Sequence, residues 1–359
     1  MRLQLITALA AALAVTAAAA SRVHADADPD AIASARITVY ADSDATSVTT
    51  SSIAVSGNVS EHLRVNAQYL VDAVSSASVD VVSSATGQIH DLRHEVTTGA
   101  AVGNSDGSVA ASYTLSTEND WTSHTVRLAL AHDFLQHDLT LGLEPQLAIN
   151  RIGRRGGVPW HDTMTTLGAE LYATYTASPR DLVSIGYGLT DHEGYQASPY
   201  RFVVYDHLRA VRESVPRTRW HQTVTVRWNH HLFEDSALRT QLRGYRDSWD
   251  VTSITAFAEY VVGFGALDLG VHLRGYAQRA ARFYRPIYNT QPTYMTADRE
   301  LSSFVDGFGG VTLSYARPLA GLDVRYELTG DGFAFQFSNF PALATRTGLV
   351  VAFGVAVSL

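Results

Sequence analysis

The sequence contains no cysteine among its 359 residues, which excludes disulfide bonds and a lipoprotein anchor. Beyond the N-terminal region, no apolar run approaches the roughly 20 residues that a membrane-spanning helix needs. This excludes helical membrane proteins but leaves membrane barrels open. The net charge of -8 is spread along the chain without a basic patch, so we expect no nucleic-acid partner.

The sequence also lacks the motifs of common enzymes. There is no GxSxG, no P-loop and no Gly-rich dinucleotide fingerprint. We therefore expect no enzymatic activity and no cofactor. An outer-membrane enzyme stays open as an alternative, because Ser, Asp and His side chains at strand ends cannot be paired from sequence.

The N-terminus has the features of an export signal. Arg2 precedes an apolar stretch that ends near Ala20, and polar residues follow, with small residues at the candidate cleavage positions. We predict a signal peptide over residues 1–25, cleaved after Ala25, with cleavage after Ala20 as the alternative. A short periplasmic segment is then expected over 26–35, and one large domain over 36–359.

The last twelve residues alternate strictly between bulky apolar and small side chains. Leu349, Val351 and Phe353 share one face with Val355, Val357 and Leu359, and the other face is nearly all Gly, Ala and Ser. Side chains of a strand point alternately to opposite faces, so this pattern predicts a strand with one apolar face. In an outer-membrane barrel, the bilayer buries such a face and the last strand closes the barrel.

The same alternation recurs along the chain in segments of about 10 to 14 residues, a length that suits tilted membrane strands. Short turns rich in Pro, Gly, Asn, Asp and Ser alternate with longer polar segments near 75–90, 153–161, 193–217, 281–301 and 337–346. We predict an all-β fold, a transmembrane antiparallel β-barrel of about 16 strands (14 being possible), with short periplasmic turns and long extracellular loops. Pro145 predicts a bulge or a broken ladder in its strand.

A soluble β-sandwich or propeller is the alternative to this fold, since its strands alternate as well. Such strands are shorter, and their connections do not alternate so regularly in length. Trp220 and Trp228 lie on the apolar face near the two ends of one segment, where a membrane barrel has aromatic girdles. The barrel is therefore the favoured interpretation.

The opposite face carries charged side chains of both signs, which would lie in the barrel lumen. They either line a pore and set its selectivity or pair across the wall and brace it, and bracing is favoured for most of them. The predicted lumen residues are Arg64, Arg127, Glu170, Arg227, Arg243, Glu259, His272, Arg274, Asp323, Arg325 and Glu327.

The fourteen histidines raise the question of a metal site. His94-Glu95, His192-Glu193 and His230-His231 are adjacent pairs, and adjacent residues of a strand point to opposite faces. None has the spacing of known metal motifs, so we predict no metal site.

Several motifs near the strand ends go beyond a generic barrel pattern. Among them are YADSD (40–44), RGYRDSWD (243–250) and YMTADREL (294–301), and the last two are the most specific. In this order the motifs resemble a family of uncharacterised bacterial outer-membrane β-barrel proteins, filed as a domain of unknown function. The resemblance implies a large outer-membrane barrel and no established activity. The chain departs from the common barrel ending, since it finishes in Leu359 rather than Phe or Trp.

The motif residues gather toward the long loops. We hypothesise that they form a hydrogen-bonded extracellular cap that folds the loops over or into the mouth. The predicted cap residues are Asp247, Trp249, Asp250, Tyr284, Asp298, Arg299 and Glu300.

These patterns favour an outer-membrane channel for small polar solutes. A structural or assembly barrel with a blocked, salt-bridged lumen is the first alternative. The expected partners are outer-membrane lipid, the barrel-assembly machinery and small polar solutes. We also expect the last strand to pair with the first near Ile37 and Val39, and the lumen beside this seam to be the least braced and roomiest part.

Overall fold

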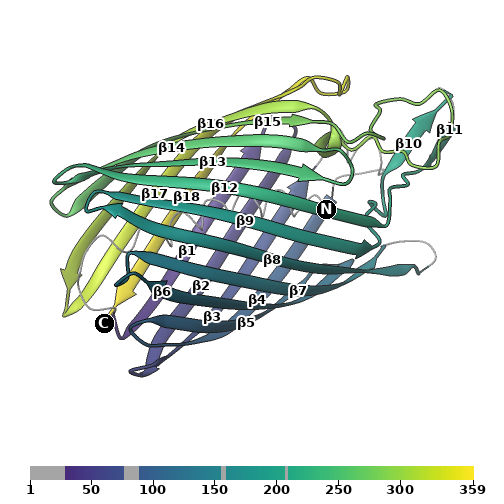
Figure 1. Cartoon of the computed structure of the whole chain (residues 1–359). Coiled ribbons are helices and arrows are strands. Elements are labelled where there is room, and N and C mark those ends of the chain that lie inside the picture. Colours follow the sequence, from purple (N-terminus) through teal and green to yellow (C-terminus); the bar gives the residue numbers. More distant parts are fainter. Residues whose placement is uncertain (1–28, 77–88, 155–158, 207–208) are drawn as a thin grey trace.

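The computed structural model describes residues 29–76, 89–154, 159–206 and 209–359 as one closed antiparallel barrel (Figure 1). Sixteen strands form its wall, so the predicted fold class is confirmed. The predicted signal peptide and both cleavage positions lie outside the described residues. The described residues contain no helix that is long and apolar enough to cross a membrane.

The barrel strands follow one another around the wall in chain order. They are β1 (Ala31–Asp42), β2 (Thr46–Ser60), β3 (Leu63–Ser76), β4 (Ile89–Gly103), β5 (Gly107–Thr117), β6 (Trp121–Phe134), β7 (Leu139–Gly153), β8 (His161–Ser178), β9 (Asp181–Gly194), β12 (Thr218–Phe233), β13 (Ser236–Asp247), β14 (Thr252–Phe264), β15 (Leu267–Arg279), β16 (Phe304–Leu319), β17 (Leu322–Phe337) and β18 (Thr345–Ser358). A separate hairpin, β10 (Phe202–Tyr205) and β11 (Arg209–Arg212), lies between β9 and β12 in the chain.

The first and last strands close the barrel, as predicted. Ile37 pairs with Phe353 and Val39 with Val351. The predicted start of the barrel at Arg36 is too late, since β1 begins at Ala31. The reason is that β18 runs to Ser358 and needs partners for its last residues, so Ile32 pairs with Ser358.

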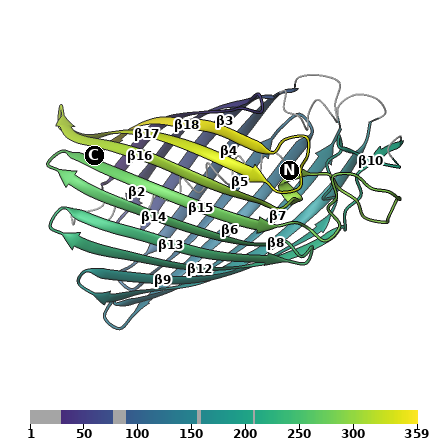
Figure 2. The same cartoon turned by 90° about the horizontal axis from the view of Figure 1, so that it is seen from above.

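The connections divide the barrel into two different ends. Tight turns such as 104–106 and 234–235 link strands at one end, which we call the short-turn end. The opposite, long-loop end carries the connections 195–217 and 280–303. Figures 1 and 2 show the β10–β11 hairpin projecting beyond this end. Both described chain ends lie at the short-turn end, where the Asp30 amide donates to the Leu359 carbonyl.

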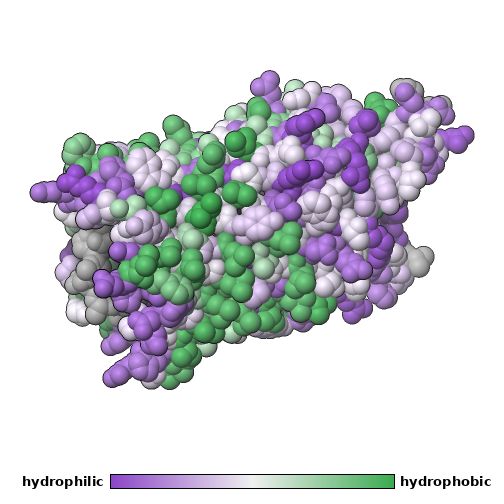
Figure 3. Space-filling view, in the orientation of Figure 1, coloured by the Kyte–Doolittle hydropathy of each residue, from purple (hydrophilic) through white to green (hydrophobic). Residues whose placement is uncertain are grey.

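The outer wall exposes the apolar face of the strands. Leu349 is 63% exposed and Leu167 is 61% exposed, although burial is the usual fate of such side chains. In Figure 3, hydrophobic side chains gather over the middle of the wall and hydrophilic ones toward its two ends. This inverted distribution is what a barrel shows when lipid surrounds it.

Pro145 lies within a continuous strand. The pairing of β6 with β7 passes from Arg127–Gln146 directly to Leu130–Leu143, so the ladder is interrupted opposite the proline. On its other side, Pro145 keeps its register with Ala169 of β8. The missing amide of proline therefore breaks the ladder on one side only.

Candidate lumen and rim site

All the predicted lumen residues lie on the strand face opposite to the exposed apolar side chains. On β12, for example, Val224 and Val226 are exposed outward, while Arg227 has the inward parity. The alternation of the strands thus directs these charges to the inside of the barrel. Their partners there divide them into three groups.

Four of them form ion pairs, all on the side of the wall from β13 to β1. His272 Nε2 is 2.5 Å from Asp331 Oδ1, and Arg274 Nη1 is 2.9 Å from Asp306 Oδ1. Glu259 pairs with Arg239 at 3.1 Å, and Glu327 pairs with Arg36 at 2.8 Å. Each pair joins different strands, so these residues brace the wall.

Three arginines bind neutral partners instead. Arg127 Nε donates to Gln146 Oε1 at 3.1 Å, and Arg227 Nε donates to Gln241 Oε1 at 2.9 Å. Arg64 donates to the Pro29 carbonyl at 3.1 Å, and to Asn58 and Ser56. Among the described residues, none of these three arginines forms an ion pair with a carboxylate.

The remaining four are Glu170, Arg243, Asp323 and Arg325. Asp323 and Arg325 are exposed at the short-turn end. Glu170 and Arg243 line a cavity of about 510 Å³ in the lumen, beside Glu144, His221 and Thr223. Gly and Ala residues of β4 to β9 supply much of the rest of its lining, so small side chains leave this space open.

We predicted that the lumen beside the seam would be the least braced and roomiest part, and this prediction is wrong. An aromatic cluster fills the half of this region that is nearer the long-loop end. Phe333, Phe335 and Phe337 of β17 are each no more than 6% exposed, and they pack with Phe304 and Phe308 of β16. Tyr40 of β1 stacks on Phe333 with ring centroids 5.4 Å apart. The small inward face of β18 makes room for these rings rather than for water, since a Cβ on Gly348 would lie 2.3 Å from Phe333 Cζ.

The predicted cap residues lie at the long-loop end, and five of the seven are buried. Asp247, Trp249, Tyr284 and Asp298 are each 1% exposed, and Arg299 is 6% exposed. Glu300 is half-buried, whereas Asp250 is exposed and only approaches Arg282, at 3.7 Å. Asp250 is therefore the one predicted cap residue that stays in solvent.

Asp247 organises the turn between β13 and β14. Its Oδ1 accepts from the backbone amides of Trp249 and Val251, both at 2.9 Å, and its Oδ2 accepts from Arg219. Trp249 then packs with Val215, Tyr284 and Leu301 in a hydrophobic cluster. A carboxylate that fixes its own turn explains why Asp precedes Ser and Trp in this motif.

Arg201 joins the two long loops from within. Its Nη1 lies 2.6 Å from Asp298 Oδ2 and 3.2 Å from Glu213 Oε2, and all three side chains are buried. Thr296 Oγ1 also donates to Glu213, at 2.8 Å. Arg201 and Glu213 belong to the loop 195–217, and Asp298 belongs to the loop 280–303, so one buried ionic cluster ties these loops together.

The joined loops also contact the rim on both sides. Arg299, in the 3-10 helix η2 (Arg299–Leu301), forms a salt bridge with Asp44 in the turn between β1 and β2. Tyr200 donates a hydrogen bond to Asp120, in the turn between β5 and β6. These contacts fasten the cap to separate points of the rim. The predicted cap residues all lie at or after Asp247, although the motif YADSD already contains the rim residue Asp44.

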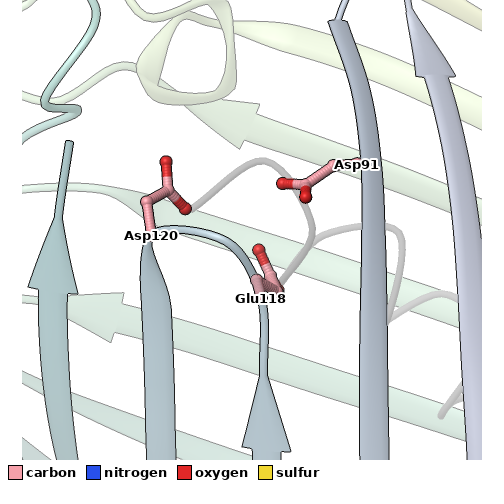
Figure 4. Close-up of side chains that lie close together, drawn as sticks. All are labelled: Asp91, Glu118 and Asp120. Atoms are coloured by element: carbon pink, nitrogen blue, oxygen red, sulfur yellow. The ribbon is translucent and has the colours of Figure 1, made fainter. Parts of the chain in front are cut away.

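Three carboxylates meet at the rim close to Tyr200. Ligand oxygens of Asp91, Glu118 and Asp120 lie within 4.8 Å of one another (Figure 4). Burial, with a smaller contribution from the charge of Asp91, raises the pKa of the Glu118 carboxyl to about 7. Carboxylate oxygens are ligands of hard divalent cations, but Asp91 and Asp120 already accept hydrogen bonds from Asn119 and Tyr200. Sequence reasoning missed this group because Asp91 is on a different strand.

Solved structures with a similar fold are outer-membrane proteins. A bacterial polysaccharide outer membrane secretin has a TM-score of 0.55 at 11% identity, covering 93% of this chain and 100% of its own. CdiB from Acinetobacter baumannii has a TM-score of 0.52 at 8% identity, covering 92% of this chain and 61% of its own. CdiB from Escherichia coli has a TM-score of 0.52 at 12% identity, covering 92% of this chain and 64% of its own. These similarities show the outer-membrane barrel fold, and no curated protein matches the sequence.

The family comparison agrees with the resemblance seen in the motifs. Residues 158–327 match the model of a family described as a protein of unknown function, DUF3570. This range includes both RGYRDSWD and YMTADREL. The predicted resemblance to an uncharacterised family of outer-membrane β-barrels is thereby confirmed over residues 158–327.

Proposed function

We propose that this protein is an integral outer-membrane channel for small polar solutes, exported through its signal peptide and inserted by the barrel-assembly machinery. The observation that carries the proposal is the lumen cavity of about 510 Å³. Its volume is in the range of small-molecule sites. We propose no catalytic role and no cofactor.

The charges of the cavity wall support a polar solute. Arg127 and Arg243 face the cavity with Glu144 and Glu170, and no ion pair joins these four side chains in the described structure. Charged groups that keep their hydration can exchange it for a passing polar solute, and rings of such groups set the selectivity of channels. The direct register of Glu144 with Glu170 places two negative charges side by side, which favours cations over anions at that point.

Conductance across planar bilayers tests the proposal. We expect a steady single-channel current from the purified barrel, with a reversal potential that shows cation preference in a salt gradient. Glu144→Gln with Glu170→Gln should shift this potential toward anions, and Arg243→Gln should shift it the other way. Asp250→Asn is the matched control, since Asp250 is exposed on the cap. The absence of current from folded protein would overturn the channel.

The alternative proposal is a structural barrel with a blocked lumen. It draws on the aromatic cluster beside the seam and on the ion pairs of Glu259, His272, Arg274 and Glu327. The same recordings separate the two proposals. A blocked barrel stays silent in the wild type and conducts only after truncation of the aromatic cluster.

A further inference from the structure

Arg246 and Arg279 lie close together on the outer wall near the long-loop end, on two strands that have one strand between them. The register aligns Arg246 of β13 with Thr252 of β14, and Thr252 with Arg279 of β15. One strand therefore separates the two arginines, and their Cα atoms are about 10 Å apart. Both side chains are exposed and have no hydrogen-bond or ion-pair partner among the described residues. Long side chains at this spacing can reach one common ligand.

The charge around the pair is uncompensated. The outward faces of β12 to β16 carry no Asp or Glu at any described position. Asp250, in the nearby turn, already approaches Arg282 at 3.7 Å. A ligand for Arg246 and Arg279 should therefore bring its own negative charge, and a phosphate matches the guanidinium geometry.

On the short-turn side of the arginines, small residues interrupt the exposed apolar wall. Gly244 and Ala277 lie in the register row directly below. The next row contains Ala256, Gly275 and Gly307. A Cβ added to Gly244 or Gly275 would have no neighbouring atom within 4 Å, so the wall is hollowed there rather than crowded. Ile254 lies between Gly244 and Ala277 in the first row, Val305 lies next to Ala277, and both are exposed, so the hollow around Gly275 is bordered by apolar side chains.

We propose that Arg246 and Arg279 bind the phosphate of a membrane lipid whose acyl chain lies in the hollow below them. Basic side chains at a membrane surface attract anionic headgroups, and exposed apolar wall attracts acyl chains. The arginines lie nearer the long-loop end and the hollow lies nearer the middle of the wall. This is the order in which the headgroup and the acyl chain of a membrane lipid would lie along the strands. The proposal rests on the proposed location in the outer membrane, but not on conduction through the lumen.

Native mass spectrometry of the full-length barrel in detergent micelles, titrated with bisphosphorylated lipid A, tests the proposal. Replacing both arginines (Arg246→Gln with Arg279→Gln) should weaken lipid A binding by about tenfold or more, as expected from the loss of charge-assisted hydrogen bonds. Arg151→Gln is the matched control, because Arg151 is also exposed on the outward face near the long-loop end but is in register with Thr122 and Thr163 rather than paired with a second arginine one strand away. The control should bind as the wild type does.

Two further measurements identify the ligand as a lipid. Gly275→Leu should fill the hollow and weaken lipid A binding, although both arginines remain. Inorganic phosphate at millimolar concentration should not displace lipid A; equal competition would mean a site for free phosphate and would overturn the proposal. Equal binding by the wild type and the double variant would also overturn it. All variants should keep wild-type conductance, so failure here and failure of the channel are separate results.

Discussion

Arg36 on the first strand and Glu327 on the penultimate strand form a 2.8 Å salt bridge that crosses the closing strand. The residue between them is Gly354 of β18, which is in register with Arg36 on one side and Glu327 on the other. Because Gly354 has no side chain, the two charges meet above its backbone. The salt bridge thus connects three strands across the seam where the barrel closes.

Removing this salt bridge should lower the free energy of unfolding slightly, and placing a bulky side chain between its two partners should lower it further. Glu327→Gln is expected to lower the free energy of unfolding by about 1 kcal/mol, the usual scale for a partly exposed pair. Gly354→Leu should separate the charges and strain the seam as well. Urea unfolding in detergent micelles measures both, with Asp250→Asn as the control. A Gly354→Leu barrel as stable as the wild type would contradict this account.

The aromatic cluster beside the seam should both stabilise the barrel and narrow the lumen. Phe308 and Phe333 stack with centroids 5.0 Å apart, and both are buried. Phe333→Ala should lower the free energy of unfolding by roughly 3–5 kcal/mol, as for other buried aromatic side chains. It should also raise single-channel conductance, because the ring fills lumen space. Phe264→Ala, a lipid-facing control that is 60% exposed, should leave conductance unchanged.

The alternation of side chains predicted the outward face of the barrel wall well, because successive side chains of a strand point to opposite faces. Val351 and Phe353 point outward and their neighbours point inward, so the apolar residues alone predicted which side chains of most strands face outward. The pairing of the seam was predictable too, since a closed barrel brings its last strand beside its first. Even the broken ladder at Pro145 follows from its missing amide.

The interior could not be predicted in the same way. Phe333, Phe335 and Phe337 alternate with Ala334 and Gln336. The rule that apolar side chains face outward would therefore place these three aromatic side chains on the lipid-facing side, opposite to where they lie. The inward pairing of Arg274 with Asp306 depends on register across two strands, which sequence does not give. Arg201 and Glu213 were not among the predicted cap residues, because Asp298, which joins them to the other loop through Arg201, lies far away in the chain.

Breaking the ionic cluster of the cap should release the long loops. Arg201→Gln leaves the buried carboxylates of Glu213 and Asp298 without their shared cation, a change that costs roughly 3–5 kcal/mol in buried pairs. Limited proteolysis with chymotrypsin should then cut the loops 195–217 and 280–303 at least several-fold faster than in the wild type. Arg282→Gln, an exposed arginine of the same cap, is the control. Unchanged proteolysis of the Arg201 variant would refute a cap held by this cluster.

Glu118 should make the rim between β5 and β6 sensitive to pH near neutrality. Burial raises the pKa of its carboxyl to about 7, above the ordinary value for glutamate, so the fold favours the protonated form. The associated stability is fully present in acid and is lost as the pH rises toward about 7. Hydrogen exchange of the turn at 118–120, corrected for intrinsic rates, should therefore be slower at pH 5 than at pH 8. Glu118→Gln should abolish the difference, whereas Glu193→Gln, at an exposed outward position, should keep it. A pH dependence that persists without Glu118 would assign the effect to another group.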